Sequence, residues 1–167
     1  GQGDQSVLKQ LADQAVADQV DAIIPINRNV NLDLNGKTLT TIECGLSVVD
    51  GATLTVSDSR TGGKLTSSGT PIRVDGTGSK AIINSGTIES TNDYGIYAKN
   101  NGAIIVNGGT VTSKDAALSG NNTTGNMNFE INGGTLTAEQ GPAIYMPGQG
   151  KLTVTNGTLN GGISLRM

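Results

Sequence analysis

The feature that most constrains the fold of this chain is a repeat of about 23 residues that runs through nearly all of it. Three columns of apolar residues keep this period, with separations of 22 to 27 residues within a column. The first column follows a Gly-[Thr/Lys] dipeptide, with one variant, and consists of Leu39, Leu65, Ile88, Val111, Leu136 and Leu159. The second lies about five residues earlier and consists of Leu34, Val56, Ile83, Val106, Ile131 and Val154. The third consists of Ile24, Leu46, Ile72, Ile96, Leu118 and Ile144. A fixed period of this length is typical of stacked repeat architectures.

Within each repeat, apolar and other residues alternate with period two, as in Leu152-Thr153-Val154. This alternation predicts short strands. Turns such as Asn107-Gly108-Gly109 separate them, because Gly and Asn tolerate the positive φ that tight corners need. An antiparallel sandwich also has short strands, but it has no reason to repeat its side chains in register. The Leu-x-x-Leu-x-Leu-x-x-Asn pattern of leucine-rich repeats is absent.

These observations predict an all-β fold, a right-handed parallel β-helix with three strands per coil of about 23 residues and about six coils. Equivalent residues of successive coils then stack about 4.8 Å apart. The right hand follows from the preference of parallel crossover connections. We expect one domain overall, with the β-helix over residues 23–167.

Both ends of such a rod expose strand edges that need protection. Residues 1–22 are predicted to form an N-terminal capping α-helix, because residues 5–20 carry one apolar face at helical spacing, with Ser6 or Asp4 as the N-cap. At the other end, Ile163-Ser164-Leu165 begins another strand. We expect either that the natural chain continues or that this C-terminal β-helix edge is covered by self-association.

Four asparagines fall in one column, four residues before each anchor of the first column: Asn35, Asn84, Asn107 and Asn132. Stacked amides can hydrogen bond along such a column, which satisfies polar groups at the corners. The alternative is ligand coordination by the amide oxygens. We interpret the four residues as a structural asparagine ladder.

The outward residues next to the third apolar column form a column of their own. It contains two of the three tyrosines, Tyr97 and Tyr145, which lie two coils apart. Tyrosines spaced along a sheet beside polar groups can stack against sugar rings and hydrogen bond with them. The alternative is that both are ordinary strand residues. The candidate ligand-binding residues are Arg73, Asp75, Tyr97, Lys99, Asn121 and Tyr145.

Threonine dominates the outward positions that flank the first column, from Thr38 to Thr158. A flat Thr-x-Thr array resembles the ice-binding face of antifreeze β-helices, although Lys64 and Glu89 interrupt it. Threonine is also a good solvent-facing strand residue. On another side, Ile82 and Ile105 are predicted to face outward on adjacent coils, which marks either an interface or an error in our register.

Composition excludes several functions. The net charge of −3 and the pI near 4.8 argue against nucleic acid as a partner. The chain has no His, so a His-based catalytic triad and a His-ligated zinc site are excluded. The single cysteine, Cys44, allows no internal disulfide, and we expect a buried, inert thiol. No apolar run of 18 residues exists, so direct membrane insertion is not expected. No cofactor and no metal site are predicted.

Catalysis has weak support in the sequence. Glycoside hydrolysis needs two carboxylates that flank one bond, yet the acidic residues are scattered over different columns and corners. The runner-up to a non-catalytic function is a polysaccharide lyase or glycoside hydrolase that uses Asp75 or Asp93 with Arg73 or Lys99.

Two segments carry a family resemblance: residues 30–39, Val-Asn-Leu-Asp-Leu-Asn-Gly-Lys-Thr-Leu, and residues 54–59, Leu-Thr-Val-Ser-Asp-Ser. Together with the later Ile-x-Asn-Gly-Gly-Thr-Leu-Thr row, they resemble pectin-lyase-like β-helix domains of bacterial adhesin-like surface and secreted proteins. The resemblance implies a secreted or cell-surface protein whose signal peptide has been removed. Catalytic members of the wider superfamily carry paired aspartates, a His-Gly, or a calcium-bound aspartate cluster with a basic residue. The first two are missing here, and no clear third is present.

We therefore predict a non-catalytic, structural or adhesive surface module whose Tyr97/Tyr145 face binds a polysaccharide or host glycan. The lyase or hydrolase is the first alternative, and ice binding by the threonine face is a lesser one. Self-association is expected either through the C-terminal edge or through Ile82 and Ile105.

Overall fold

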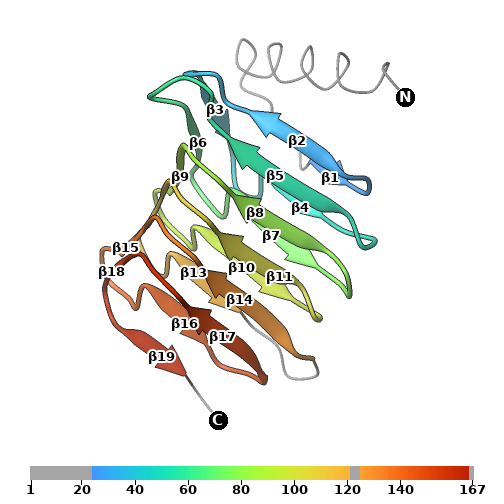
Figure 1. Ribbon diagram of the computed structural model, residues 1–167, viewed down its shortest axis with the longest axis vertical. Coiled ribbons are helices and arrows are strands. Elements are labelled where there is room, and N and C mark those ends of the chain that lie inside the picture. Colours follow the sequence, from blue (N-terminus) through green and yellow to red (C-terminus); the bar gives the residue numbers. More distant parts are fainter. Residues whose placement is uncertain (1–23, 121–124, 166–167) are drawn as a thin grey trace.

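The computed structural model describes residues 24–120 and 125–165, and these form a parallel β-helix of the right-handed type with about six coils (Figure 1). Each coil contributes one strand to each of three parallel sheets, and neighbouring strands come from successive coils. The three strands per coil and the stacking of the coils confirm the predicted architecture.

Sheet A has seven strands, namely β1 (Ile24–Ile26), β4 (Leu46–Val48), β7 (Ile72–Asp75), β10 (Ile96–Lys99), β13 (Leu118–Gly120), β16 (Ile144–Met146) and β19 (Ile163–Leu165). Sheet B has six, namely β2 (Val30–Asp33), β5 (Thr53–Ser57), β8 (Lys80–Ile83), β11 (Ala103–Val106), β14 (Met127–Ile131) and β17 (Gly150–Val154). Sheet C has six, namely β3 (Thr38–Thr41), β6 (Lys64–Ser67), β9 (Thr87–Ser90), β12 (Thr110–Ser113), β15 (Thr135–Ala138) and β18 (Thr158–Asn160).

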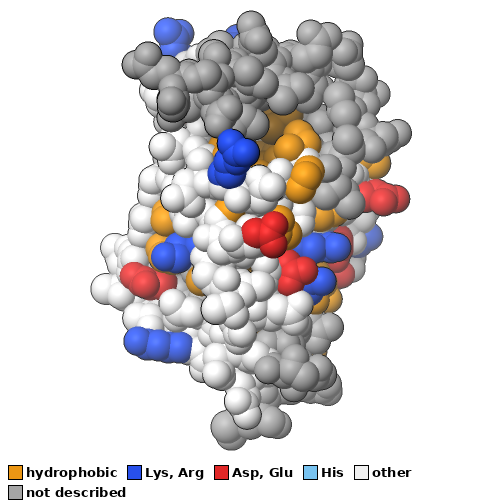
Figure 2. Space-filling view, turned by 90° about the vertical axis from the view of Figure 1, so that its right-hand side faces the viewer, with side chains coloured by type: hydrophobic (Ala, Val, Ile, Leu, Met, Phe, Trp, Pro, Cys, Tyr) orange, Lys and Arg blue, Asp and Glu red, His pale blue; other side chains and the backbone are white. Residues whose placement is uncertain are grey.

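The interior of the rod is a single apolar core. Side chains alternate between buried and partly exposed along most strands, so each sheet presents one face inward. The largest fully buried side chains come from all three sheets and include Phe129, Leu54, Ile72, Ile88 and Ile104. Outside, charged side chains stand singly or in small groups among white, uncharged ones on the face in Figure 2. The core therefore comes from the repeat, while the outer faces differ from sheet to sheet.

The register confirms the first and third predicted columns in full. In the first column each residue pairs with the next one, from Leu39 with Leu65 to Leu136 with Leu159. In the third column the pairs run from Ile24 with Leu46 to Leu118 with Ile144. The second column is correct from Val56 onward but wrong at its start.

Leu32, rather than Leu34, pairs with Val56. Leu34 is still buried, with 4% of its surface exposed, because it fills the corner between β2 and β3. Its carbonyl accepts a hydrogen bond from the backbone N–H of Lys37 at 2.8 Å, which closes a tight turn. Asn35 and Gly36 occupy that turn with φ of 50° and 70°.

The asparagine ladder forms through three of its four predicted members. Asn107 Nδ2 donates to Asn84 Oδ1 at 2.9 Å, and Asn132 Nδ2 donates to Asn107 Oδ1 at 3.0 Å. Asn35 does not belong to the series, because the first coil is shifted by two residues in this column and places Asn35 in the turn. There its backbone N–H donates to Asp33 Oδ1 instead.

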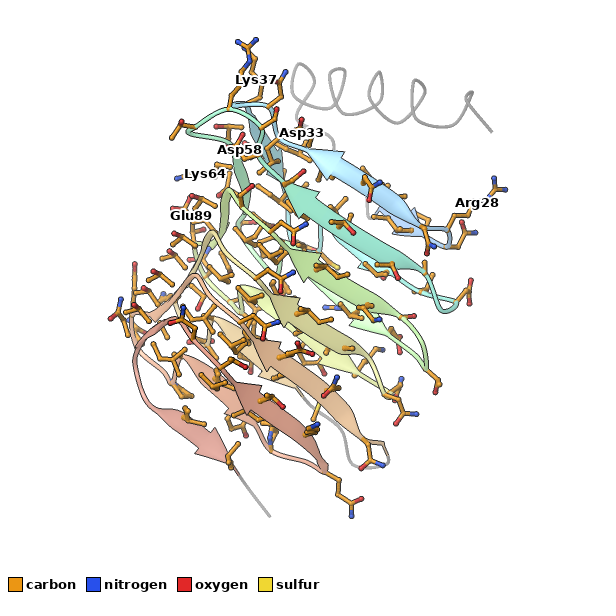
Figure 3. The ribbon with its side chains drawn as sticks, viewed as in Figure 1. Arg28, Asp33, Lys37, Asp58, Lys64 and Glu89 are labelled. Carbon is orange, nitrogen blue, oxygen red and sulfur yellow. The ribbon has the colours of Figure 1, made fainter. Side chains whose placement is uncertain are left out.

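The corners between sheets B and C also depend on glycine and on one half-buried carboxylate. Gly109 has a φ of +78°, and a Cβ there would lie 2.6 Å from the carbonyl oxygen of Gly86 in the coil below. Nearer the N-terminal end, Asp58 accepts backbone hydrogen bonds from Gly36 and Gly63, both at 2.7 Å (Figure 3). Close stacking of corners thus excludes side chains where backbone meets backbone.

The predicted capping helix of residues 1–22 lies outside the described residues. Across residues 24–120 and 125–165 the structure contains no helix, and hence none that is long and apolar enough to cross a membrane. At the opposite end the last coil is open, and Val154, Ile163 and Leu165 have 44%, 47% and 59% of their surface exposed.

Candidate functional site

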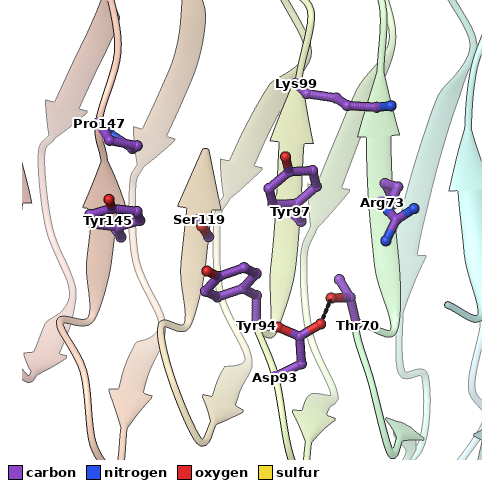
Figure 4. A pocket seen from close by; sticks show the side chains of 9 residues that line it. All are labelled: Thr70, Arg73, Asp93, Tyr94, Tyr97, Lys99, Ser119, Tyr145 and Pro147. Carbon is purple, nitrogen blue, oxygen red and sulfur yellow. Dashed lines mark hydrogen bonds between the residues drawn. The ribbon is translucent and has the colours of Figure 1, made fainter. Parts of the chain in front are cut away.

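The outer side of sheet A carries a hollow of about 570 Å³ that we call the tyrosine groove (Figure 4). It contains all three tyrosines of the chain together with charged and hydroxyl side chains. Its lining residues are Thr70, Arg73, Asp93, Tyr94, Tyr97, Lys99, Ser119, Tyr145 and Pro147.

Two parts of the fold build the groove. The outward column of sheet A runs in register from Arg73 on β7 to Tyr97 on β10, Ser119 on β13 and Tyr145 on β16. These side chains face outward because the residues on either side of them in each strand, such as Ile96 and Ala98, are buried. The turns that lead from sheet C into sheet A supply the rest of the wall, including Tyr94.

Tyr97 stands between two flat side chains. The guanidinium carbon of Arg73 lies 5.7 Å from the centre of the Tyr97 ring, and the ring of Tyr94 stacks at 5.9 Å with an interplanar angle of 13°. Figure 4 shows Arg73 and Tyr94 on opposite sides of this ring. Both contacts are favourable. The faces of the Tyr97 ring are therefore engaged within the chain, and the ring stands up from the sheet.

The Tyr94 phenol has a raised pKa. Burial is the largest cause, and the nearby carboxylates of Asp93 and Asp115 add to it, while the neighbouring Ser119 hydroxyl acts in the opposite direction. Asp93 itself accepts a hydrogen bond from Thr70 Oγ1 at 2.7 Å. Tyr94 therefore remains a neutral phenol at physiological pH, able to donate and to accept a hydrogen bond.

An ion pair lies beside the groove. Lys99 Nζ is 3.0 Å from Asp75 Oδ2, and Asn100 Nδ2 donates to Asp75 Oδ1 at 2.7 Å. Burial alone would raise the pKa of Asp75, but the hydrogen bonds from Lys99 and Asn100 and the charges of Lys99 and Arg73 outweigh it and lower the pKa. Asp75 is thus engaged by its own neighbours.

Two polar atoms of the groove are buried and have no hydrogen-bond partner among the described residues: Arg73 Nε and Ser119 Oγ. Only 1% of the Ser119 surface is exposed, although its strand position faces outward. A buried polar group without a partner is costly and uncommon in folded proteins. These two atoms are therefore candidates for contact with a ligand.

A second hollow of about 360 Å³ continues past Arg73 along the turns, and shares Thr70, Arg73 and Asp93 with the tyrosine groove. Cys44 lines it, is 6% exposed and is a free thiol. Burial is the main cause of its raised pKa, the charge of Asp93 adds to it, and Arg73 acts in the opposite direction. A raised pKa keeps the thiol protonated and weakly nucleophilic, as expected from the sequence.

The structure brings together four of the six predicted ligand-binding residues in one groove: Arg73, Tyr97, Lys99 and Tyr145. Asp75 lies outside the groove lining and is linked to it through Lys99. Asn121 lies outside the described residues.

Sequence reasoning did not include Tyr94 and Ser119 among the site residues. One sequence feature could have indicated Tyr94. It lies two residues before Ile96, as Thr70 lies two residues before Ile72. Both lie in turns that lead into strands of sheet A, and both line the groove.

The outer side of sheet C has the predicted threonine array in register, from Thr110 to Thr135 to Thr158 and from Thr112 to Thr137. Lys64 and Glu89 interrupt it as an ion pair at 3.1 Å (Figure 3). On sheet B, Ile82 pairs with Ile105, both half-buried and outward, between Thr55 and Glu130. The register predicted there is confirmed.

The described residues contain no group of three or more His, Cys, Asp or Glu side chains placed to hold a metal ion. Comparisons of the chain with protein-family models, curated proteins and solved structures found no match. The parallel β-helix therefore stands on the structure alone, and the likeness to pectin-lyase-like adhesins remains a prediction from the sequence.

Proposed function

We propose that the chain is a non-catalytic β-helix module, secreted or displayed at a cell surface, that binds glycans in the tyrosine groove. The observation that carries this proposal is the convergence of three tyrosines with two buried, unpartnered polar atoms in one hollow. Sugars offer apolar C–H faces and a rim of hydroxyls, and tyrosine can contact both. A hydroxyl-rich ligand would also supply partners for Arg73 Nε and Ser119 Oγ.

The state of the carboxylates supports a binding role over catalysis. Asp93 is hydrogen bonded to Thr70, and Asp75 is held by Lys99 and Asn100. A general acid in a glycosidase has a raised pKa, whereas the pKa of Asp75 is lowered.

The test is retention of the protein on immobilised polysaccharides and mucin glycans, beside the double variant Tyr97→Ala/Tyr145→Ala. We expect the wild type to be retained on at least one glycan and the double variant to lose retention while remaining folded by circular dichroism. The matched control is Thr110→Ala/Thr135→Ala on sheet C, which should bind as the wild type does. Retention that survives in the double variant, or no retention of the wild type on any glycan, would overturn the proposal.

The non-catalytic part of the proposal is tested separately. The retained glycans are incubated with the protein and assayed for new reducing ends and for unsaturated ends. We expect none. New chain ends that disappear in Asp93→Asn or Asp75→Asn would replace this proposal with a lyase or hydrolase.

A further inference from the structure

The tyrosine groove and the second hollow meet at three side chains. Thr70, Arg73 and Asp93 line both hollows. Figure 4 shows Asp93 and Thr70 below the Tyr97 ring, and Arg73 beside that ring on the side away from Tyr94. Arg73 and Asp93 bring opposite charges to this place, which we call the Arg73–Asp93 junction.

The two charges of the junction are not paired. Lys99 and Asp75, which come from the same two neighbouring coils, form an ion pair at 3.0 Å. Within residues 24–120 and 125–165, by contrast, no ion pair joins Arg73 and Asp93 to each other or to any other residue. Leaving a partly buried charge unpaired is unfavourable, because the charge has lost part of its hydration without gaining a partner.

Contacts with the rest of the chain hold the two charged groups in place. The guanidinium carbon of Arg73 lies 5.7 Å from the centre of the Tyr97 ring, which fixes the guanidinium against that ring. Asp93 Oδ2 accepts a hydrogen bond from Thr70 Oγ1 at 2.7 Å, and the backbone N–H of Asp93 donates to Ser90 Oγ at 3.0 Å. The junction therefore offers a fixed cation and a fixed anion rather than two mobile surface side chains.

Both charged groups have atoms that a ligand can reach. No described residue accepts a hydrogen bond from the Arg73 guanidinium, and of its three nitrogens only Nε is buried, so the two Nη atoms are open to the hollows. Asp93 Oδ1 likewise has no partner among the described residues and is not buried. A ligand that contacts these atoms displaces no ring, because the faces of Tyr97 stay covered by Arg73 and Tyr94.

The combination of charges selects the charge pattern of the ligand. Both charges act on Cys44: burial is the largest cause of its raised pKa, Arg73 acts to lower the pKa and Asp93 acts to raise it. A purely anionic ligand would be attracted by Arg73 and repelled by Asp93, and a purely cationic one would meet the reverse. A ligand that carries both charges gains from both groups.

We propose that the Arg73–Asp93 junction binds a zwitterionic sugar residue, with its carboxylate at the Arg73 Nη atoms and its ammonium group at Asp93 Oδ1. This inference rests on the proposed glycan binding and specifies the substrate class as glycans that carry both an acidic group and a free amine. A groove that binds neutral sugars through its tyrosines alone would show no such preference.

The first arm of the test uses the wild type alone and four sugars built on one glucopyranose ring. N-acetylglucosamine is neutral, glucosamine carries an ammonium group, N-acetylmuramic acid carries a carboxylate, and muramic acid carries both. Their affinities are compared by NMR titration. We expect muramic acid to bind about tenfold more tightly than N-acetylglucosamine, because it forms two charge-assisted contacts. The two singly charged sugars should gain little, and added salt should reduce the advantage of muramic acid.

The second arm removes one charge at a time. In Arg73→Gln only the carboxylate of Asp93 remains at the junction, so glucosamine should bind as well as muramic acid does. In Asp93→Asn only the guanidinium remains, so N-acetylmuramic acid should bind as well as muramic acid does. The matched control is Lys64→Gln/Glu89→Gln, which removes the ion pair on sheet C and should keep the wild-type order of affinities. Circular dichroism verifies that each variant is folded.

The outcomes separate this inference from the proposed function. If the wild type is retained on glycans but binds the four sugars alike, or if both folded variants keep the wild-type order, the charge assignment is wrong and glycan binding in the groove stands. If muramic acid is preferred while no glycan is retained, the junction stands and the proposed function fails. If neither the sugars nor the glycans bind, both fail.

Discussion

Sheets A and C are wound by the same coils at the same spacing, yet their outer faces differ in kind. Sheet C presents threonines of one size in register, as in Thr110, Thr135 and Thr158, whereas the groove of about 570 Å³ lies on sheet A. Sheet A alternates bulky and small residues, Tyr97, Ser119 and Tyr145. A groove on a parallel β-helix thus arises from alternating side-chain size along the axis, on a backbone that is the same everywhere.

Ion pairs do not account for the difference between the outer faces of sheets A and C. In the part of the chain that the structure describes, each face has a lysine–carboxylate pair between adjacent coils, Lys64 with Glu89 on sheet C at 3.1 Å and Lys99 with Asp75 on sheet A at 3.0 Å. The four side chains have similar exposure, between 29% and 36%. Aromatic stacking and buried unpartnered atoms, rather than ion pairs, therefore distinguish the two faces.

The largest expected effect comes from the core that both faces share. Ile131→Asp places a charge in a fully buried position, and an unpaired buried charge costs several kcal/mol. We expect the domain to unfold, as measured by circular dichroism and thermal melting. Ile105→Asp, the same change at an outward position of the adjacent strand, should remain folded. A folded Ile131→Asp protein with cooperative melting would contradict the inward assignment.

The second-largest effect is a difference in unfolding free energy between alanine variants of two tyrosines on the outer face of sheet A. Tyr97→Ala removes the stack with Tyr94 and the contact with Arg73, and should cost about 1 to 3 kcal/mol of unfolding free energy. Tyr145, which pairs with Ser119 and Ser164, should cost less when changed to alanine. Urea denaturation measures both. Equal losses would show that the stack on Tyr97 adds no stability.

A smaller effect depends on pH. Because the pKa of Asp75 is lowered in the folded state, its contribution to stability is present above its ordinary value of 3.8 and is lost as the pH falls through the lower, folded value. Asp75→Asn should cost up to about 1 kcal/mol at neutral pH, as surface ion pairs do. The difference from the wild type should shrink in acid. Urea denaturation across this pH range measures it, and a double-mutant cycle with Lys99→Met is the control. A difference independent of pH would assign the effect to something other than the charge.

The smallest effect is expected on sheet C. Thr110→Ala, at a partly exposed position of β12, should change the unfolding free energy by less than about 0.5 kcal/mol. It should also leave glycan retention unchanged. A loss comparable with that of Tyr97→Ala would show that the threonine columns stabilise the rod as much as the aromatic stack does.

The columns of the repeat were predictable because burial repeats at every coil. Leu65, Ile88 and Val111 occupy equivalent positions, and a single shift in register would expose all of them. The prediction was wrong only where the corner changes shape. In the first coil Asn35 and Gly36 form a tight turn, so Leu34 fills a corner and Leu32 takes the strand position. Turn conformation is not encoded in the alternation of strands.

The part of the site that lies in the repeat could be predicted from the sequence in the same way. Arg73, Tyr97 and Tyr145 share a column, so their neighbourhood followed from the register. The position of Tyr94 did not, because it belongs to a turn whose path the period leaves open. Nor did the burial of Ser119, since an outward strand position is ordinarily exposed and here the flanking side chains cover it.

The sequence by itself determined the parallel β-helix, its coil length, the inward columns and the choice of residues on each face. It could do so because one spacing is repeated and every coil must bury the same positions. Only the tertiary structure decided that Tyr94 stacks on Tyr97, that Lys99 turns to Asp75 and that Ser119 Oγ is left without a partner. These outcomes depend on side-chain rotamers and turn paths, which are selected by contacts between coils and not by the repeat.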